Sequence, residues 1–236
     1  MAKSISKKSS KNTKNSKSKK FSILDKIRDV EIKDSVKFNI DIYPQSEEFT
    51  SAAACALMVL KFLNKNVNPD KEEEYKIWQE AVNGSIWYGS KYGLAYALAK
   101  RGADVKIISN TEDPGYEKKM AVEENFNLDA LEASFNEIKD KAFSLNVEEA
   151  KAPVSINLIK KALSAKYIPI LLVNASLINT YLDEFPHWVV VKGYEKDIFY
   201  INDPYTGNEV TVDAAVLKDA LGFDDNMHML LVRAKK

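Results

Sequence analysis

The sequence has one cysteine and two histidines in 236 residues. One cysteine excludes an intrachain disulfide and any zinc cluster built from several cysteines. Two histidines are too few for a histidine-rich metal centre, and the sequence has no glycine-rich phosphate loop or dinucleotide fingerprint. We therefore expect neither a cofactor nor a bound metal.

Long apolar runs are also missing. The longest, such as Ile168 to Val173, are far too short to cross a bilayer. The lysine-rich start is not followed by the apolar stretch of a secretory signal. We expect a soluble, cytoplasmic protein with no membrane span. Its composition, 45% apolar and 29% charged, is ordinary for a globular chain.

Charge is unevenly distributed along the chain. Residues 1–20 carry eight lysines, no acid and almost no apolar side chain, so we expect a disordered tail. Residues 21–236 then form a single domain with 26 basic and 34 acidic residues. The tail allows two interpretations: a weak contact with polyanions, or a solubilising or self-docking segment on an acidic body. The sequence does not indicate the oligomeric state.

Hydrophobic periodicity predicts helices that precede most of the strands. The helices are expected over 21–33, 51–64, 68–82, 91–101, 110–153 and 157–165, and the strands over 36–42, 105–108, 167–174, 188–194, 197–202 and 228–233. Residues 84–89 are expected to form a loop. Helices first and closely spaced strands last are typical of an α+β fold, with a helical layer packed on an antiparallel sheet.

Four residues have the arrangement of a nucleophilic catalytic site. Ser51 begins the apolar helix, where the backbone N–H groups and the helix dipole stabilise an oxyanion. Gln45, six residues earlier, can supply a second oxyanion donor. His187 begins a strand and can act as the base, and Asp203, sixteen residues later, can orient the imidazole.

These residues resemble the papain-like cysteine peptidases. The segments QSEEFTSAAACALMVL, PHWVVVKGYEKD and FYINDPYTG are similar to those of the bacteriocin-processing (double-glycine leader) peptidases and their stand-alone relatives, over about residues 36–235. The resemblance implies a papain-like fold and acyl transfer from a peptide or amide carbonyl. It also implies a peptide or protein substrate.

The chain departs from this family at the nucleophile. Where the family has Cys-Gly-Pro-Ala, this sequence has Ser51 followed by three alanines. Cys55 lies one helical turn further on, about 6 Å deeper. Cys55 is interpreted either as a core residue or as a displaced nucleophile. Ser51 is interpreted either as a helix N-cap alone or as an N-cap that is also the nucleophile.

Two functions follow from these alternatives. The first is a peptidase or amidase that uses Ser51, His187, Asp203 and Gln45, acting by hydrolysis or by transfer to an amine. The second is an inactive pseudopeptidase that binds a peptide or protein tail in the retained cleft. His228, with no carboxylate motif around it, is expected to be structural. Trp87 and Tyr88 belong to the core or line a cleft, and the acids at 72–74 are expected to form a solvated helix start.

Overall fold

The computed structural model describes residues 23–84, 86–112 and 114–235. The predicted disordered tail, residues 1–20, lies outside the described residues. The helices are α1 (Ile23–Arg28), α2 (Ser51–Phe62), α3 (Lys71–Ala81), α4 (Lys91–Lys100), α5 (Tyr116–Glu123), α6 (Leu128–Ser144), α7 (Ile156–Ser164), α8 (Ala175–Ile178) and α9 (Ala214–Ala220). The strands are β1 (Ser35–Lys37), β2 (Val82–Asn83), β3 (Ile86–Gly89), β4 (Ala103–Ser109), β5 (Glu148–Lys151), β6 (Ile168–Asn174), β7 (Pro186–Glu195), β8 (Ile198–Asp203), β9 (Asn208–Asp213) and β10 (His228–Ala234).

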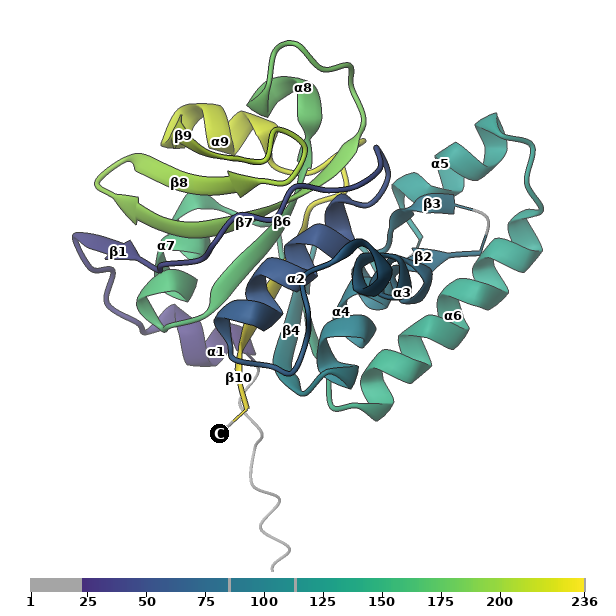
Figure 1. Cartoon of the computed structure of the whole chain (residues 1–236), viewed down its shortest axis with the longest axis horizontal. Coiled ribbons are helices and arrows are strands. Elements are labelled where there is room, and N and C mark those ends of the chain that lie inside the picture. The colour runs from purple at the N-terminus through teal and green to yellow at the C-terminus, as the bar shows by residue number, and fades with distance from the viewer. Residues whose placement is uncertain (1–22, 85, 113, 236) are drawn as a thin grey trace, which may run out of the picture.

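One large mixed sheet organises the fold (Figure 1). Its strand order is β5-β4-β10-β6-β7-β8-β9, with β1 added on β7. All neighbours are antiparallel except β4 and β5, which are parallel. The predicted α+β fold with helices on an antiparallel-rich sheet is confirmed. The parallel pair was not predicted, because β5 has the acidic sequence EEAK and no apolar alternation.

Helices cover both faces of this sheet. The first core cluster joins α2 and α4 to side chains such as Trp188 and Val190 of β7. The second joins α1, α7 and α9 to the alternate residues Val189 and Val191. The sequence had predicted a single helical layer, but a sheet this rich in apolar side chains on both faces needs a cover on each.

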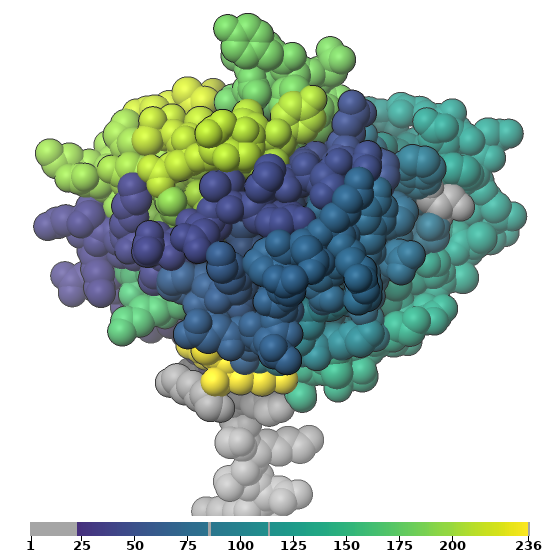
Figure 2. All heavy atoms as spheres, viewed as in Figure 1, coloured from purple at the N-terminus to yellow at the C-terminus, as the bar shows by residue number. Residues whose placement is uncertain are grey.

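Helix α2 is enclosed on all sides, as its Ala- and Leu-rich sequence predicted. Residues 51–60 are all buried. The helix packs on β7, α3 and α4, so it has no solvated face. In the space-filling view, the dark-blue residues that include α2 and α3 lie between the yellow-green strands β8 and β9 and the teal helices α5 and α6 (Figure 2).

Several short elements differ from the predictions. The strand expected over 36–42 is only Ser35–Lys37, and the loop expected over 84–89 contains β3. Strand β9 and helix α9 were not predicted, because only Val212, Leu217 and Ala220 of these two elements are buried. No helix in the described part of the chain is long and apolar enough to span a membrane.

Candidate active site

The first turn of α2 lies against the start of β7. Ser51 is the first helical residue, and its Oγ accepts a hydrogen bond from the backbone N–H of Trp188 at 3.3 Å. The N-cap is Thr50, not Ser51 as expected, and the Thr50 hydroxyl donates to the Glu47 carbonyl at 2.9 Å instead of capping the helix. Ser51 and the residue after His187 therefore meet, although they are 137 positions apart in sequence.

His187 and Asp203 form a buried pair on the adjacent strands β7 and β8. His187 Nε2 lies 2.8 Å from Asp203 Oδ1, and both side chains are 1% exposed. A carboxylate only accepts hydrogen bonds, so Nε2 carries the proton. Burial alone would raise the pKa of Asp203. The hydrogen bond and the charge of His187, together with the Tyr205 N–H, outweigh burial, so the pKa of Asp203 lies below its usual range.

The second nitrogen of His187 has no partner. Nδ1 is buried and makes no hydrogen bond with any described residue. The rings of Phe185 and Tyr205 flank the imidazole edge-on, with centroids 6.0 and 6.4 Å away. The His187 ring is thus held in place by Asp203 and two aromatic rings, and no hydrogen bond joins it to Ser51 among the described residues.

Gln45 lies next to the turn that follows Asp203, but its side-chain amide is bonded to its own loop. Its backbone N–H donates to the Pro204 carbonyl at 2.9 Å, which ties its loop to the turn after Asp203. Its Nε2 donates to the carbonyls of Glu47 at 2.8 Å and Glu48 at 3.1 Å. Both amide protons are used within the loop, so the expected role as an oxyanion donor stays a prediction that requires this loop to rearrange.

Cys55 packs one turn below Ser51. Its thiol is fully buried and donates to the Trp188 carbonyl at 3.2 Å. Burial first, and the negative charge of Asp203 second, raise the pKa of the Cys55 thiol well above its usual range. A thiol of this kind does not ionise near neutral pH, so the geometry fits the packing interpretation.

A buried carboxylate that the sequence did not single out anchors the Gln45 loop. Glu74, expected to be solvated, is fully buried. It accepts hydrogen bonds from Tyr43 Oη at 3.0 Å, Ser46 N at 2.8 Å and Ser46 Oγ at 2.5 Å. Burial and the nearby Glu74 charge raise the pKa of Tyr43 to about 12. The sequence could not predict this burial, because Glu74 follows two other glutamates and nothing in the pattern distinguishes it from them.

Trp188 connects this site to the rest of the core. Its indole N–H donates to the Gly89 carbonyl at 2.8 Å, and Tyr116 donates to the same oxygen at 3.0 Å. Gly89 lies so close to α2 that a Cβ atom there would collide with Ala52. The missing side chain at Gly89 therefore allows β3 to approach the first turn of the helix.

A family model described as "Peptidase_C39 like family" matches residues 40–220. The chain belongs to this C39-like family. The resemblance to the leader-processing peptidases found in the sequence is thereby confirmed. Whether Ser51 stands at the position of the family's cysteine stays a prediction. No curated protein matches the chain.

Two solved structures are similar to this C39-like chain, and the first of them shows that it has the same fold. A C39-like peptidase from Bacillus anthracis is 15% identical, covers 86% of this chain and 99% of its own, and has a TM-score of 0.51. A double glycine motif protease from an AMS/PCAT transporter, solved in complex with the leader peptide, is also 15% identical. It covers 85% of this chain and 95% of its own, with a TM-score of 0.46.

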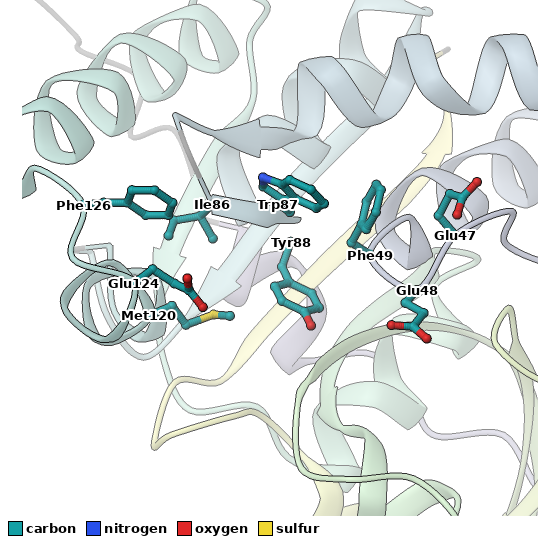
Figure 3. Close-up of a pocket in the computed structure, with 9 residues that line it drawn as sticks. All are labelled: Glu47, Glu48, Phe49, Ile86, Trp87, Tyr88, Met120, Glu124 and Phe126. Carbon is teal, nitrogen blue, oxygen red and sulfur yellow. The ribbon is translucent and has the colours of Figure 1, made fainter.

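Two adjacent cavities open beside the site of this C39-like chain. The larger one, about 570 Å³, is lined by Glu47, Glu48, Phe49, Ile86, Trp87, Tyr88, Met120, Glu124 and Phe126 (Figure 3). The smaller one, about 240 Å³, is lined by Glu48, Tyr88, Tyr181, Leu182, Asp183, Phe185 and Tyr205. They share Glu48 and Tyr88, and we call the two together the aromatic groove. Phe185 and Tyr205 also flank His187, so the groove reaches the edge of the site.

The prediction that Trp87 and Tyr88 line a cleft agrees with this groove. Trp87 is 59% exposed and packs edge-on against Phe49, with centroids 5.0 Å apart. The described residues contain no group of three or more His, Cys, Asp or Glu side chains that could hold a metal ion.

Proposed function

We propose that this C39-like protein binds an extended peptide in the aromatic groove and does not cleave it. The observation that carries the proposal is the unpartnered Nδ1 of His187: among the described residues, no nucleophile lies within hydrogen-bond reach of this nitrogen. The Ser51 oxygen instead accepts a backbone N–H, and the amide of Gln45 is bonded within its own loop. The only thiol, Cys55, is buried and protonated.

Chemical reactivity supports the same conclusion. A papain-type site works by holding a thiolate next to an imidazolium, and a serine hydroxyl does not form that ion pair. Ser51 would need a general base at about 3 Å to become a nucleophile. We therefore infer that the chain keeps the family's fold and the His187–Asp203 pair, whereas Ser51 and Cys55 on α2 contribute only to packing. The larger cavity of the groove, at about 570 Å³, has room for side chains of a bound peptide, and the smaller one, at about 240 Å³, extends to the edge of the pair.

A second candidate is a serine-type amidase or peptidase. It is favoured by the 2.8 Å contact between His187 and Asp203, which holds the imidazole as a catalytic base requires. In this case Ser51 would turn its hydroxyl from Trp188 to His187 Nδ1, and Gln45 would release the loop carbonyls. Hydrolysis and transfer to an amine would use the same groups.

A labelling experiment separates the two candidates. Under the binding proposal, a serine-directed fluorophosphonate probe does not label the wild-type chain. The Ser51→Cys variant, with a thiol at the helix N-terminus beside the pair, should react with iodoacetamide at pH 6 about tenfold faster than a free thiol. Cys55 in the wild-type chain is the internal control, and it should stay unreactive in the folded protein because it is buried.

The matched variant Ser51→Cys/His187→Ala should lose the fast alkylation. Fluorophosphonate labelling of the wild-type chain that disappears in both Ser51→Ala and His187→Ala would instead establish the serine enzyme. If the Ser51→Cys thiol reacts no faster than a free thiol, the pair does not act on position 51, and the serine enzyme is ruled out.

A further inference from the structure

The aromatic groove has acidic walls. Four carboxylates line its two cavities, and no Lys, Arg or His is among the described lining residues. Of the four, only Glu47 has an ion pair, with Lys71 at 3.0 Å. Glu48, Glu124 and Asp183 are exposed and form no ion pair with another described residue. Three negative charges along one groove are therefore uncompensated.

Exposed rings lie between these charges. Trp87 is 59% exposed and Tyr181 97% exposed. Tyr88 is near enough to Glu48 for the carboxylate, after burial, to raise the pKa of the phenol. Figure 3 shows Phe49, Trp87 and Tyr88 side by side, with Glu48 next to them. Aromatic faces and carboxylates together bind ammonium groups, through cation–π contacts and charge-assisted hydrogen bonds.

The chain itself contains a segment of complementary charge. Eight of its 34 basic residues and none of its 34 acidic residues lie in residues 1–20, which leaves 26 basic against 34 acidic residues in the remainder. We call residues 1–20 the lysine tail. The lysine tail has almost no apolar side chains to bury elsewhere, and its positive charge equals the excess negative charge of the domain.

The lysine tail is long enough to reach the groove. The domain begins at α1, which packs on α7 and β5, on the other face of the sheet from α2. The 22 residues before Ile23 can span about 75 Å when extended. A globular domain of about 210 residues has a diameter of about 45 Å. A tether of this length holds the tail at an effective concentration in the millimolar range, at which weak contacts are occupied.

We propose that the aromatic groove is a lysine-binding surface occupied by the lysine tail of the same chain. The tail's ammonium groups pair with Glu48, Glu124 and Asp183 and stack on the exposed rings between them. The tail then competes with any peptide that binds the groove. This inference does not depend on whether Ser51 is a nucleophile, because none of the three carboxylates belongs to the His187–Asp203 pair.

Zero-length carbodiimide cross-linking of the full chain tests this contact, because it joins an amine to a carboxylate only where the two touch. In 20 mM salt, lysines of residues 1–20 should link to Glu48, Glu124 and Asp183 about tenfold more often than to three other exposed acids, Glu132, Asp140 and Asp219. The preference should disappear in 0.5 M salt, since screening removes contacts between exposed charges. An even distribution over all six acids would overturn the proposal.

An isotope mixture identifies the source of the tail. Equal amounts of unlabelled and ¹⁵N-labelled chain should give cross-links only within one isotope, as expected for a tail bound to its own domain. Mixed cross-links would show that the groove takes the tail of a second copy, and the assignment to the same chain would be wrong.

The fluorescence of Trp87 gives an independent readout, obtained by subtracting the spectrum of the Trp87→Phe variant. The variant Glu48→Gln/Glu124→Gln/Asp183→Asn should release the tail and raise acrylamide quenching of Trp87 about twofold. The matched variant Glu132→Gln/Asp140→Asn/Asp219→Asn removes the same number of charges and should leave quenching unchanged. Equal quenching in both variants and in the wild-type chain would contradict occupancy of the groove.

Discussion

The two histidines of this chain are both neighbours of one tryptophan, Trp188, but lie in two different electrostatic environments. His187 directly precedes Trp188, and the ring of His228 stacks on the Trp188 indole, with centroids 6.5 Å apart. Both imidazoles are buried, at 1% and 3% exposure. His187 contacts a carboxylate, whereas His228 is hydrogen-bonded to the Ser109 hydroxyl at 2.9 Å, next to the buried Lys91.

The charge of the neighbour decides what each imidazole can do. Burial and the positive charge of Lys91 lower the pKa of His228 to about 3, so this ring stays neutral and serves packing. The Asp203 carboxylate, in contrast, accepts a hydrogen bond from His187 Nε2 at 2.8 Å. Burial alone therefore does not identify a catalytic histidine. The sign of the nearest charge distinguishes the two rings, and the buried, neutral ring of His228 agrees with the structural role expected from the sequence.

The largest effect expected from this comparison is a loss of stability at acidic pH, caused by protonation of His228. Its folded-state pKa of about 3 lies below the unfolded value near 6.5, so protons bind the unfolded chain more tightly. The stabilising contribution is complete above pH 6.5 and falls as the pH decreases towards 3. We expect a loss of about 3 kcal/mol in the free energy of unfolding between pH 7 and pH 4, measured by urea titration.

The control for this prediction is a variant without the His228 imidazole. The His228→Gln variant should lose most of the dependence between pH 6.5 and 5, where few carboxylates titrate. The same slope in wild type and His228→Gln would show that His228 is not the group responsible.

Removal of the Asp203 carboxylate, the partner of His187, should have the next largest effect on the free energy of unfolding. Asp203→Ala leaves His187 Nε2 and the Tyr205 N–H without an acceptor in a buried site. We expect a loss of about 2 to 3 kcal/mol at pH 7 by urea titration. Asp183→Ala, at an exposed position in the groove, should cost under about 0.5 kcal/mol. Equal losses in the two variants would mean that the buried pair contributes no stability.

The sequence predicted the elements that carry Ser51, His187 and Asp203, but not the buried charged residues around them. Helix α2 and the strands that carry His187 and Asp203 follow from long apolar runs, and the approach of Ser51 to β7 follows from the family resemblance. Lys91 and Glu74 were not predicted to be buried, because their partners are distant in sequence: Lys91 pairs with Glu149 at 3.1 Å, and Glu74 binds the 43–46 segment.

Short-range geometry limited the remaining predictions. The inward turn of the Gln45 amide depends on two loop carbonyls whose directions no residue pattern specifies. The N-cap is Thr50 and not the expected Ser51. The Ser51 oxygen accepts a hydrogen bond from Trp188 of β7, 137 positions away, and not from its own helix. Such choices are made by tertiary contacts, which local propensity does not contain.

A third test addresses the support that holds Trp188 between the two histidines. Gly89→Ala places a methyl group against Ala52 and pushes β3, with the carbonyl that Trp188 and Tyr116 share, away from α2. Overpacking of this kind should cost about 2 kcal/mol in urea titration. The double variant Gly89→Ala/Ala52→Gly moves the methyl group across the contact and should recover part of the loss. A double variant less stable than both single variants would contradict this account.

The smallest effect is expected at Ser51. Ser51→Ala removes the acceptor of the buried Trp188 N–H and should cost about 1 kcal/mol. Ser144→Ala, on the exposed end of α6, is the matched control and should change stability by under about 0.5 kcal/mol. A gain in stability on Ser51→Ala would indicate a strained residue kept for chemistry, and would favour the serine enzyme.

The position of β10 has a consequence for how the molecule is assembled. This strand follows all other described strands in sequence, yet it pairs with β4 on one side and β6 on the other. Until residues 228–234 are made, the β5–β4 pair and the strands from β6 to β9 remain two separate half-sheets, each with an unpaired apolar edge. Unpaired edges can pair with strands of other chains, so the nascent protein is exposed to such pairing until β10 joins the two halves.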